Sequence, residues 1–187
     1  NNPLKILGEY KNYTSVVVLD RFLTARNSIN FRKQSIFSVK AIATSYDNNI
    51  WIFDEQDYKL KKIDETGKLL LESPDMRQLL DTVPSPDLII DSDNLVYLYD
   101  AKKGFYIFDY YGAFKNTIPF LNWTDIAISR NKIMGFSDNR LYSYELNSMN
   151  LKTYTLPTFF RDYLAIKAVN GKVYLLKKDA LEIYRFE

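Results

Sequence analysis

The feature that most limits how this chain can fold is a unit of polar turns and apolar runs that recurs along it. Each copy has a polar turn, an apolar run, a short charged turn, a second apolar run and a closing turn. The copies occupy residues 2–24, 47–70, 91–114, 129–151 and 169–187, and the first fits less closely than the rest. The second run ends at Asp20, Asp64, Asp109, Glu145 and Arg185, so successive copies are 44, 45, 36 and 40 residues apart.

A repeat of about 40–45 residues that contains several short strands is typical of β-propeller blades. The segments between the copies supply the remaining strands. Innermost strands are expected at residues 40–47, 86–93, 123–130 and 163–170, and outer strands at 68–73, 113–118 and 151–156. With 15 Tyr and 12 Phe, the composition also favours pleated, well-packed strands. We therefore predict an all-β fold, a β-propeller of four-stranded antiparallel blades, as a single domain over residues 1–187.

The strands within each copy are apolar at every position, as in NIWIF (49–53), LVYLY (95–99) and FYIF (105–108). A sheet with one face in water would instead alternate apolar and polar residues. Continuous apolar strands need both faces covered, as when each blade lies between two others. The core of a β-sandwich or a β-barrel could also use such runs, but a sandwich has no reason to repeat at this period.

The number of blades follows from where the copies begin and end. The first copy starts at its second strand and the last ends on its third, which predicts three full and two partial blades in this chain. A propeller closes its ring so that no blade edge is left unpaired. Either the partial blades complete a five-bladed ring, or the domain lacks an upstream portion. We favour the second alternative, with five to seven blades in the whole ring.

Charge and residue usage exclude several classes of function. With 25 basic and 23 acidic side chains the net charge is +2, which does not suggest binding to nucleic acid or anionic lipid. The chain has no Cys and no His, which excludes disulfides, thiolate zinc sites and Ser-His-Asp triads. No apolar run is long enough for a transmembrane helix. We predict a protein that is not an enzyme and needs no cofactor.

Two segments carry a resemblance to known families. YDNNIWIFD (46–54) with YKLKKIDETGKLL (58–70) resembles the repeat of six-bladed NHL propellers. Residues 2–23 followed by 42–64 are similar to an uncharacterised exported β-propeller family of Bacteroidota, flavobacteria especially, and the similarity covers about residues 2–187. The resemblance implies an exported protein of the periplasm or outer-membrane periphery, made with an upstream signal peptide. It supplies no catalytic motif.

Acidic side chains recur at the turns, and each set has two interpretations. Asp47, Asp91 and Asp93 lie beside asparagines and could bind calcium, but Asx side chains also stabilise tight turns. Acids at strand ends could form acid–base pairs as in some hydrolases and lactonases; these are Asp20, Asp54, Asp64, Asp100 and Asp109. Because they recur in each copy, we favour a structural role. The lysine pairs 61–62, 102–103 and 177–178 are interpreted as solvated, or as part of an anionic partner site.

The loops between blades do not repeat, so we look for function there. Residues 74–83 are expected to form a short helix starting near Pro74. The apolar loop residues are candidates for partner binding, or they cover the core: Ile36, Phe37, Met76, Leu79, Leu80, Trp123, Phe159 and Phe160.

The sequence therefore predicts a non-enzymatic interaction scaffold. Its protein partners are expected to be subunits of an outer-membrane or envelope complex. The alternatives are a carbohydrate- or metal-binding propeller, which includes a carboxylate-based hydrolase or lactonase, and a self-associating module that completes its ring with another chain.

Overall fold

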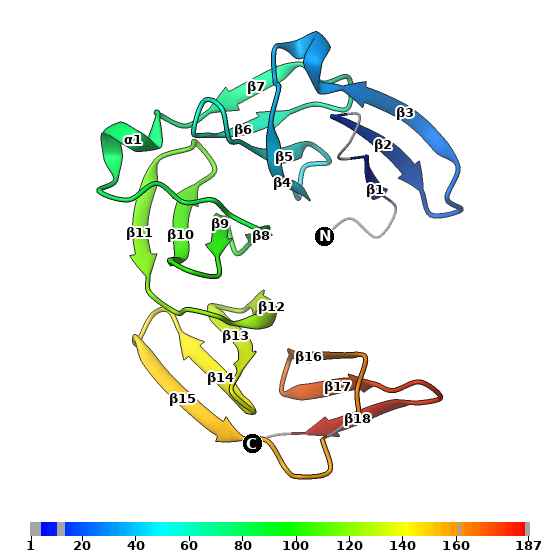
Figure 1. Cartoon of the computed structure of the whole chain (residues 1–187), viewed down its shortest axis with the longest axis vertical. Coiled ribbons are helices and arrows are strands. Elements are labelled where there is room, and N and C mark those ends of the chain that lie inside the picture. Colours follow the sequence, from blue (N-terminus) through cyan, green and yellow to red (C-terminus); the bar gives the residue numbers. More distant parts are fainter. Residues whose placement is uncertain (1–4, 11–13, 161, 186–187) are drawn as a thin grey trace. The chain divides into compact units, whose positions relative to one another are not determined.

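The computed structural model describes residues 5–10, 14–160 and 162–185, which form five antiparallel sheets (Figure 1). Within each sheet, neighbouring strands are consecutive in the chain. Sheet A contains β1 (Lys5–Tyr10), β2 (Ser15–Asp20) and β3 (Ala25–Asn30). Sheet B contains β4 (Val39–Thr44), β5 (Ile50–Asp54), β6 (Lys59–Ile63) and β7 (Leu69–Glu72). Sheet C contains β8 (Leu88–Ser92), β9 (Leu95–Asp100), β10 (Gly104–Asp109) and β11 (Phe114–Ile118).

Two further sheets follow along the chain. Sheet D contains β12 (Thr124–Ser129), β13 (Lys132–Ser137), β14 (Arg140–Glu145) and β15 (Asn150–Thr155). Sheet E contains β16 (Ala165–Val169), β17 (Lys172–Leu176) and β18 (Leu181–Arg185). The expected four-stranded antiparallel blade is therefore present in sheets B, C and D, whereas sheets A and E have three described strands. The total number of blades in a closed ring stays a prediction.

The chain divides into two compact units, residues 1–121 with sheets A to C and residues 122–187 with sheets D and E. The assignment of all 187 residues to one domain stays a prediction.

In the first unit, the two faces of β5 enter different hydrophobic cores. Ile50 and Ile52 pack with β2 and β3, and Trp51 and Phe53 pack with β9 and β10. All four side chains are fully buried. This confirms that a strand apolar at every position has both faces covered, because sheet B lies between sheets A and C. In the second unit, one core joins sheets D and E; it includes Met134, Phe136, Ile166 and Val173.

One turn type links the last two described strands of sheets A, B and C, which are β2 and β3, β6 and β7, and β10 and β11. The leading Asp carboxylate accepts hydrogen bonds from the backbone N–H groups two and four residues later, and the residue three positions on has a positive φ. The acceptors are Asp20, Asp64 and Asp109, and the positive-φ residues are Leu23, Gly67 and Gly112. These bonds confirm the structural interpretation of the three acids.

The acids that end the second strand also serve turns. Asp54 accepts a hydrogen bond from Gln56 N–H at 3.0 Å, and Asp100 accepts one from Lys102 N–H at 2.8 Å. Both carboxylates are buried. Lys61 Nζ lies 2.7 Å from Asp54 Oδ2. The interpretation of Lys61 as a solvated lysine was therefore wrong, because its place on β6 turns it into the protein.

The connections between sheets differ in length, from residues 119–123 to residues 73–87. A 3₁₀ turn, η2 (Phe31–Gln34), follows β3, and the only α-helix of the described residues is α1 (Met76–Leu79). It is one turn long and is capped by the Asp75 side chain, which accepts from Arg77 N–H. The helix is thus shorter than the expected 74–83, and it begins after Asp75. Within the described residues, no helix has the length and apolar character needed to cross a bilayer.

Gly104 is expected to be intolerant of any side chain. Its φ is +95°, and an added Cβ would lie 2.3 Å from the carbonyl oxygen of Ile118. We expect Gly104→Ala to lower the free energy of unfolding by about 3 kcal/mol, measured by urea unfolding. Gly8→Ala is the control, because Gly8 has no positive φ and its nearest neighbour would be 3.7 Å away. An equal loss in both variants would contradict this explanation.

Tyr97, on β9, offers a substitution that should stabilise the fold. Its hydroxyl is buried and has no hydrogen-bond partner among the described residues, and burial raises its pKa to about 12. Removing an unsatisfied buried hydroxyl should raise the free energy of unfolding of Tyr97→Phe by about 1 kcal/mol. Tyr110→Phe should instead lose stability, because the Tyr110 hydroxyl donates to Asp91. Thermal unfolding of the two variants decides, and destabilisation by Tyr97→Phe contradicts the prediction.

Candidate functional site: a tyrosine groove in the first unit

An open hollow of about 570 Å³ lies between sheets B and C, at the end where strands one and two of each sheet are joined. We call it the tyrosine groove. It is lined by Tyr46, Asp47, Asn49, Lys62, Leu70, Leu71, Asn94, Asp109, Tyr110 and Tyr111. The lining comes from the β4–β5 turn, from β6 and β7, and from the turns that follow β8 and β10.

Asp91, at the end of β8, holds the base of the groove together. Its Oδ2 accepts hydrogen bonds from Ser45 Oγ at 2.9 Å and from Trp51 Nε1 at 3.0 Å. Its Oδ1 accepts one from the Tyr110 hydroxyl at 2.5 Å. One carboxylate of sheet C thus links two side chains of sheet B to the aromatic ring that follows β10. Burial and the bond to Asp91 raise the pKa of Tyr110 well above its usual value.

Three aromatic rings surround the ammonium group of Lys62. Tyr46 stacks on Tyr110 with ring centroids 4.9 Å apart, and Trp51 stacks on the same ring at 6.3 Å. The Lys62 Nζ atom lies 5.0 Å from the Trp51 ring, 5.5 Å from Tyr110 and 5.6 Å from Tyr46. These distances are within the range of cation–π attraction. The lysine therefore fixes the orientation of all three rings.

Asp47 completes the charge balance of this cluster. Its Oδ2 lies 2.6 Å from Lys62 Nζ. Partial burial is the largest influence on Asp47 and opposes ionisation, but the hydrogen bonds from Lys62, Ser45 and Asn49 together outweigh it. They lower the pKa of Asp47 from 3.8 to about 2. Lys62, like Lys61, is therefore not a solvated lysine: it is buried and paired.

The rim of the groove is aromatic and open to solvent. Tyr46 is 62% exposed although its ring is stacked, and Tyr111 is 84% exposed. Leu70, on β7, is 47% exposed beside them. Asp109 pairs with Lys115 at 2.9 Å, so both acids of the lining have a cationic partner. The groove thus offers ordered aromatic surface without an unpaired charge from these acids.

The calcium hypothesis for Asp47, Asp91 and Asp93 gains no support from this geometry. Asp47 and Asp91 are occupied by protein donors, and Asp93 is a turn residue with a φ of 53°. No group of three or more metal-ligating side chains is found among the described residues. The turn interpretation was nevertheless incomplete for Asp91, which binds side chains of the adjacent sheet and not its own turn. That role depends on a contact between residues 40 or more positions apart.

The eight predicted partner-binding residues have different environments. Four are buried: Ile36, Met76, Trp123 and Phe160. Leu80 packs partly buried against the core of sheets B and C. The remaining three are exposed, namely Phe37 at 54%, Leu79 at 43% and Phe159 at 56%. The burial of the other residues agrees with the alternative interpretation, in which the loop residues cover the core. Partner binding through the exposed members stays a prediction.

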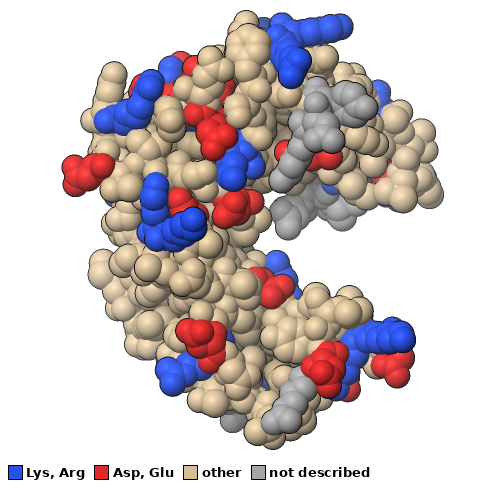
Figure 2. Space-filling model, viewed as in Figure 1, with Lys and Arg blue, Asp and Glu red and all other residues tan. Residues whose placement is uncertain are grey.

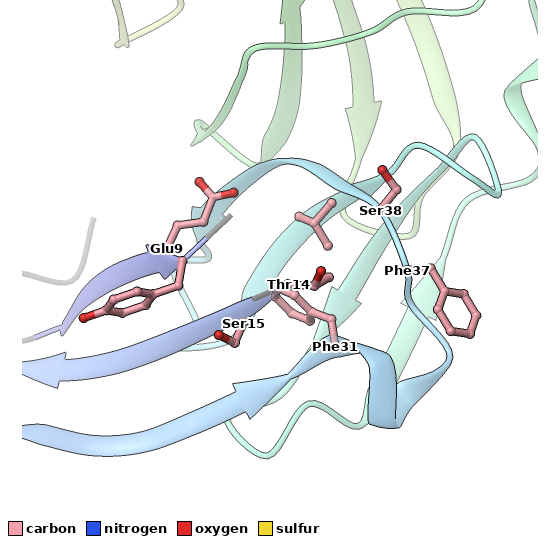
Figure 3. A pocket seen from close by; sticks show the side chains of 8 residues that line it. Glu9, Thr14, Ser15, Phe31, Phe37 and Ser38 are labelled. Atoms are coloured by element: carbon pink, nitrogen blue, oxygen red, sulfur yellow. The ribbon is translucent and has the colours of Figure 1, made fainter. Parts of the chain in front are cut away.

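Phe37 borders a second, small pocket of about 100 Å³ in the first unit. Figure 3 shows Glu9, Thr14, Ser15, Phe31 and Ser38 around it, with the Phe37 ring directed away from the other labelled side chains. A pocket of this size holds only a few water molecules.

On the face seen in Figure 2, basic and acidic side chains are interspersed, so this face shows no broad region of one sign of charge.

Comparisons with known proteins identify the fold and not the family. No known family profile matches the chain, and no curated protein matches it. Among solved structures, streptogramin B lyase superposes with a TM-score of 0.62 at 15% identity, over 99% of this chain and 66% of that chain. Virginiamycin B lyase from Staphylococcus aureus, solved with quinupristin as a catalytically inactive His-to-Ala variant, gives 0.62 at 12%, over 97% and 66%.

The Pan2 WD40 domain of Neurospora crassa gives a TM-score of 0.61 at 14% identity, over 91% of this chain and 56% of that chain. The chain thus spans less than two thirds of the length of these structures. At such identities the similarity establishes a fold alone. The chain has the all-β fold of a β-propeller, with its five sheets as blades; the NHL and Bacteroidota resemblances stay predictions.

The pKa of Asp47 leads to a pH-dependent prediction. Since its pKa is lower in the folded state, its contribution to stability is present above pH 3.8 and is lost as the pH falls towards 2. After allowance for solvent screening, we expect Asp47→Asn to lower the free energy of unfolding at pH 7 by about 1 kcal/mol. The difference from the wild type should shrink towards zero at pH 2, as measured by urea unfolding. Asp179→Asn, at an exposed turn, is the control.

Proposed function

We propose that this protein is a non-enzymatic β-propeller interaction module that binds a protein partner at the tyrosine groove. The observation that carries the proposal is the exposed Tyr46 ring, which is held in place by stacking and by the cation of Lys62. A large exposed side chain that is already ordered loses little conformational entropy on binding. Tyrosine is also among the residue types that contribute most to the affinity of protein interfaces.

The groove supports this role better than the loops between blades do. Tyr46, Tyr111 and Leu70 are all exposed and line one hollow. The exposed loop residues of the same unit, Phe37 and Leu79, do not line this hollow, and Phe37 borders only the small pocket of about 100 Å³ described above. A concave surface with aromatic anchors excludes water from a partner more completely than single exposed side chains do.

Two observations support a binding role over catalysis. The recurring acids accept backbone hydrogen bonds or pair with lysines, so they are committed to structure. A His-to-Ala variant of the similar virginiamycin B lyase is catalytically inactive, and this chain has no His. We infer that it does not share that chemistry. On the resemblance to exported propellers, we place the protein in the periplasm or at the outer-membrane periphery, within an envelope complex.

A second candidate ligand is a neutral carbohydrate. The amides of Asn49 and Asn94 line the groove together with the exposed tyrosines. Amide groups both donate and accept hydrogen bonds, as sugar hydroxyls require, and tyrosine rings present a flat apolar face. This alternative uses the same surface, so a glycan array probed with the wild type and with Tyr111→Ala distinguishes it from protein binding.

The test compares the proteins that co-purify from native envelope with the wild type and with Tyr46→Ala/Tyr111→Ala, quantified by mass spectrometry. We expect a partner that is enriched by the wild type and at least about tenfold less by the double variant, since each anchor contributes about 1–2 kcal/mol or more. The partner is then purified, and its affinity for both forms is measured by calorimetry.

Phe22→Ala is the matched control, because Phe22 is 73% exposed and lies outside the groove. Phe37→Ala/Leu79→Ala tests the competing loop surface. If that variant loses the partner and the tyrosine variant keeps it, the proposed site is wrong. Both tyrosines are exposed, so thermal unfolding should show little change and should separate lost binding from lost folding.

A further inference from the structure

A second groove, within the second unit, has a different chemical character. It has a volume of about 480 Å³ and lies between one face of sheet D and the β16–β17 turn of sheet E. We call it the cationic groove. Its main lining residues are Arg130, Lys132, Lys152, Glu145, Met134 and Tyr154. The cationic groove occupies the position in sheet D that corresponds to the tyrosine groove in sheet B. Met134, Ser143 and Lys152 lie opposite one another on adjacent strands of sheet D. Trp51, Lys62 and Leu71 have the same arrangement in sheet B.

The cations of this groove outnumber its acids. Arg130, Lys132 and Lys152 are exposed, and none forms an ion pair within the described part of the chain. The single carboxylate of the lining, Glu145, accepts a hydrogen bond from Ser148 Oγ at 2.7 Å. Three positive side chains thus share the groove with one acid. This contrasts with Lys62 in the tyrosine groove, which pairs with Asp47.

The register of the strands shows how the charges are spread. In the strand register, Lys132, Glu145 and Asn150 lie opposite one another on adjacent strands. The next row of the same face holds Met134, Ser143 and Lys152. Lys132 and Lys152 are therefore two strands apart, which corresponds to about 10 Å between their backbones. Arg130 lies in the turn before β13. Cations at this spacing can contact several carboxylates at separate positions along a chain.

The floor of the groove is apolar. Met134 is 4% exposed and belongs to the hydrophobic core, and the Tyr154 ring packs against that core while lining the groove. A methionine side chain adapts to different apolar groups that pack against it. A ligand that fits this floor and these cations needs acidic groups on both sides of an apolar one. In an extended peptide, side chains two residues apart lie about 7 Å from each other on one side.

We propose that the cationic groove binds an extended acidic segment of a polypeptide in which acidic and apolar residues alternate at every second position, so that both kinds of side chain face the groove. This site is distinct from the tyrosine groove and does not depend on the function proposed for it. Its affinity should decrease as salt increases, because the three cations are exposed and are screened by ions.

The test uses the full chain and a fluorescein-labelled peptide that repeats Glu-Ser-Leu-Ser, in which Glu and Leu lie on the same side of an extended chain. Binding is followed by fluorescence anisotropy at low and at physiological ionic strength. We expect Lys132→Glu and Lys152→Glu each to weaken binding about tenfold, since a reversed charge repels the peptide. Lys178→Glu is the matched control. It makes the same change in net charge at an exposed turn residue that does not line the groove, and it should leave the affinity unchanged.

Three results overturn the proposal: an equal loss of affinity in Lys178→Glu, equal binding of a peptide with Gln in place of Glu, or binding of a sulfated polysaccharide without binding of the peptide. The neutral variant Lys152→Gln gives a second measurement if a reversed charge disturbs folding, and it should weaken binding by about half as much on a logarithmic scale. Tyr111→Ala should not change peptide binding, which keeps this test independent of the tyrosine groove.

Discussion

The structure of the first unit depends on the burial of both faces of sheet B. Strand β5 places Ile50 and Ile52 in one core and Trp51 and Phe53 in another, and all four side chains are fully buried. Burying an apolar side chain of this size contributes about 1.5–3 kcal/mol, but only where another sheet covers it. A sheet of this composition could not be stable alone, since its exposed face would be as apolar as its buried one. The repeat is therefore a physical requirement, because within each unit one sheet covers a face of another.

The same frame explains why the two grooves differ although they occupy equivalent positions. In the first unit, Trp51, Lys62 and Leu71 form one row across sheet B beside Tyr110, and Asp47 neutralises Lys62. In the second unit the corresponding row is Met134–Ser143–Lys152, and no acid neutralises its lysine within the described residues. Backbone geometry is shared, so the chemistry of each groove is determined by the side chains that do not repeat. This is the expected division in repeat proteins, where the frame is common and recognition is local.

Much of the fold could be predicted from the residues alone. The period of the copies indicated the blades, and the recurrence of Asp20, Asp64 and Asp109 indicated turns, which their backbone hydrogen bonds confirm. The candidate site could not be found this way. Tyr46 and Tyr111 were not singled out, although two tyrosines in succession at positions 110 and 111, where the other copies have none, were a usable signal. Among the apolar loop residues, the sequence does not separate Phe37, which is exposed, from Ile36, which is buried.

By itself, the sequence determined most of the strands, although not β3, and the repeated order of strands and turns, because periodicity and turn chemistry are local properties. Only the tertiary structure decided which polar groups meet. Asp91 holds Ser45, Trp51 and Tyr110 through contacts across 46, 40 and 19 residues. Lys62, which the sequence suggests is solvated, places its ammonium group 5.0–5.6 Å from three stacked aromatic rings. Such contacts depend on how neighbouring sheets pack, which no local pattern of residues specifies.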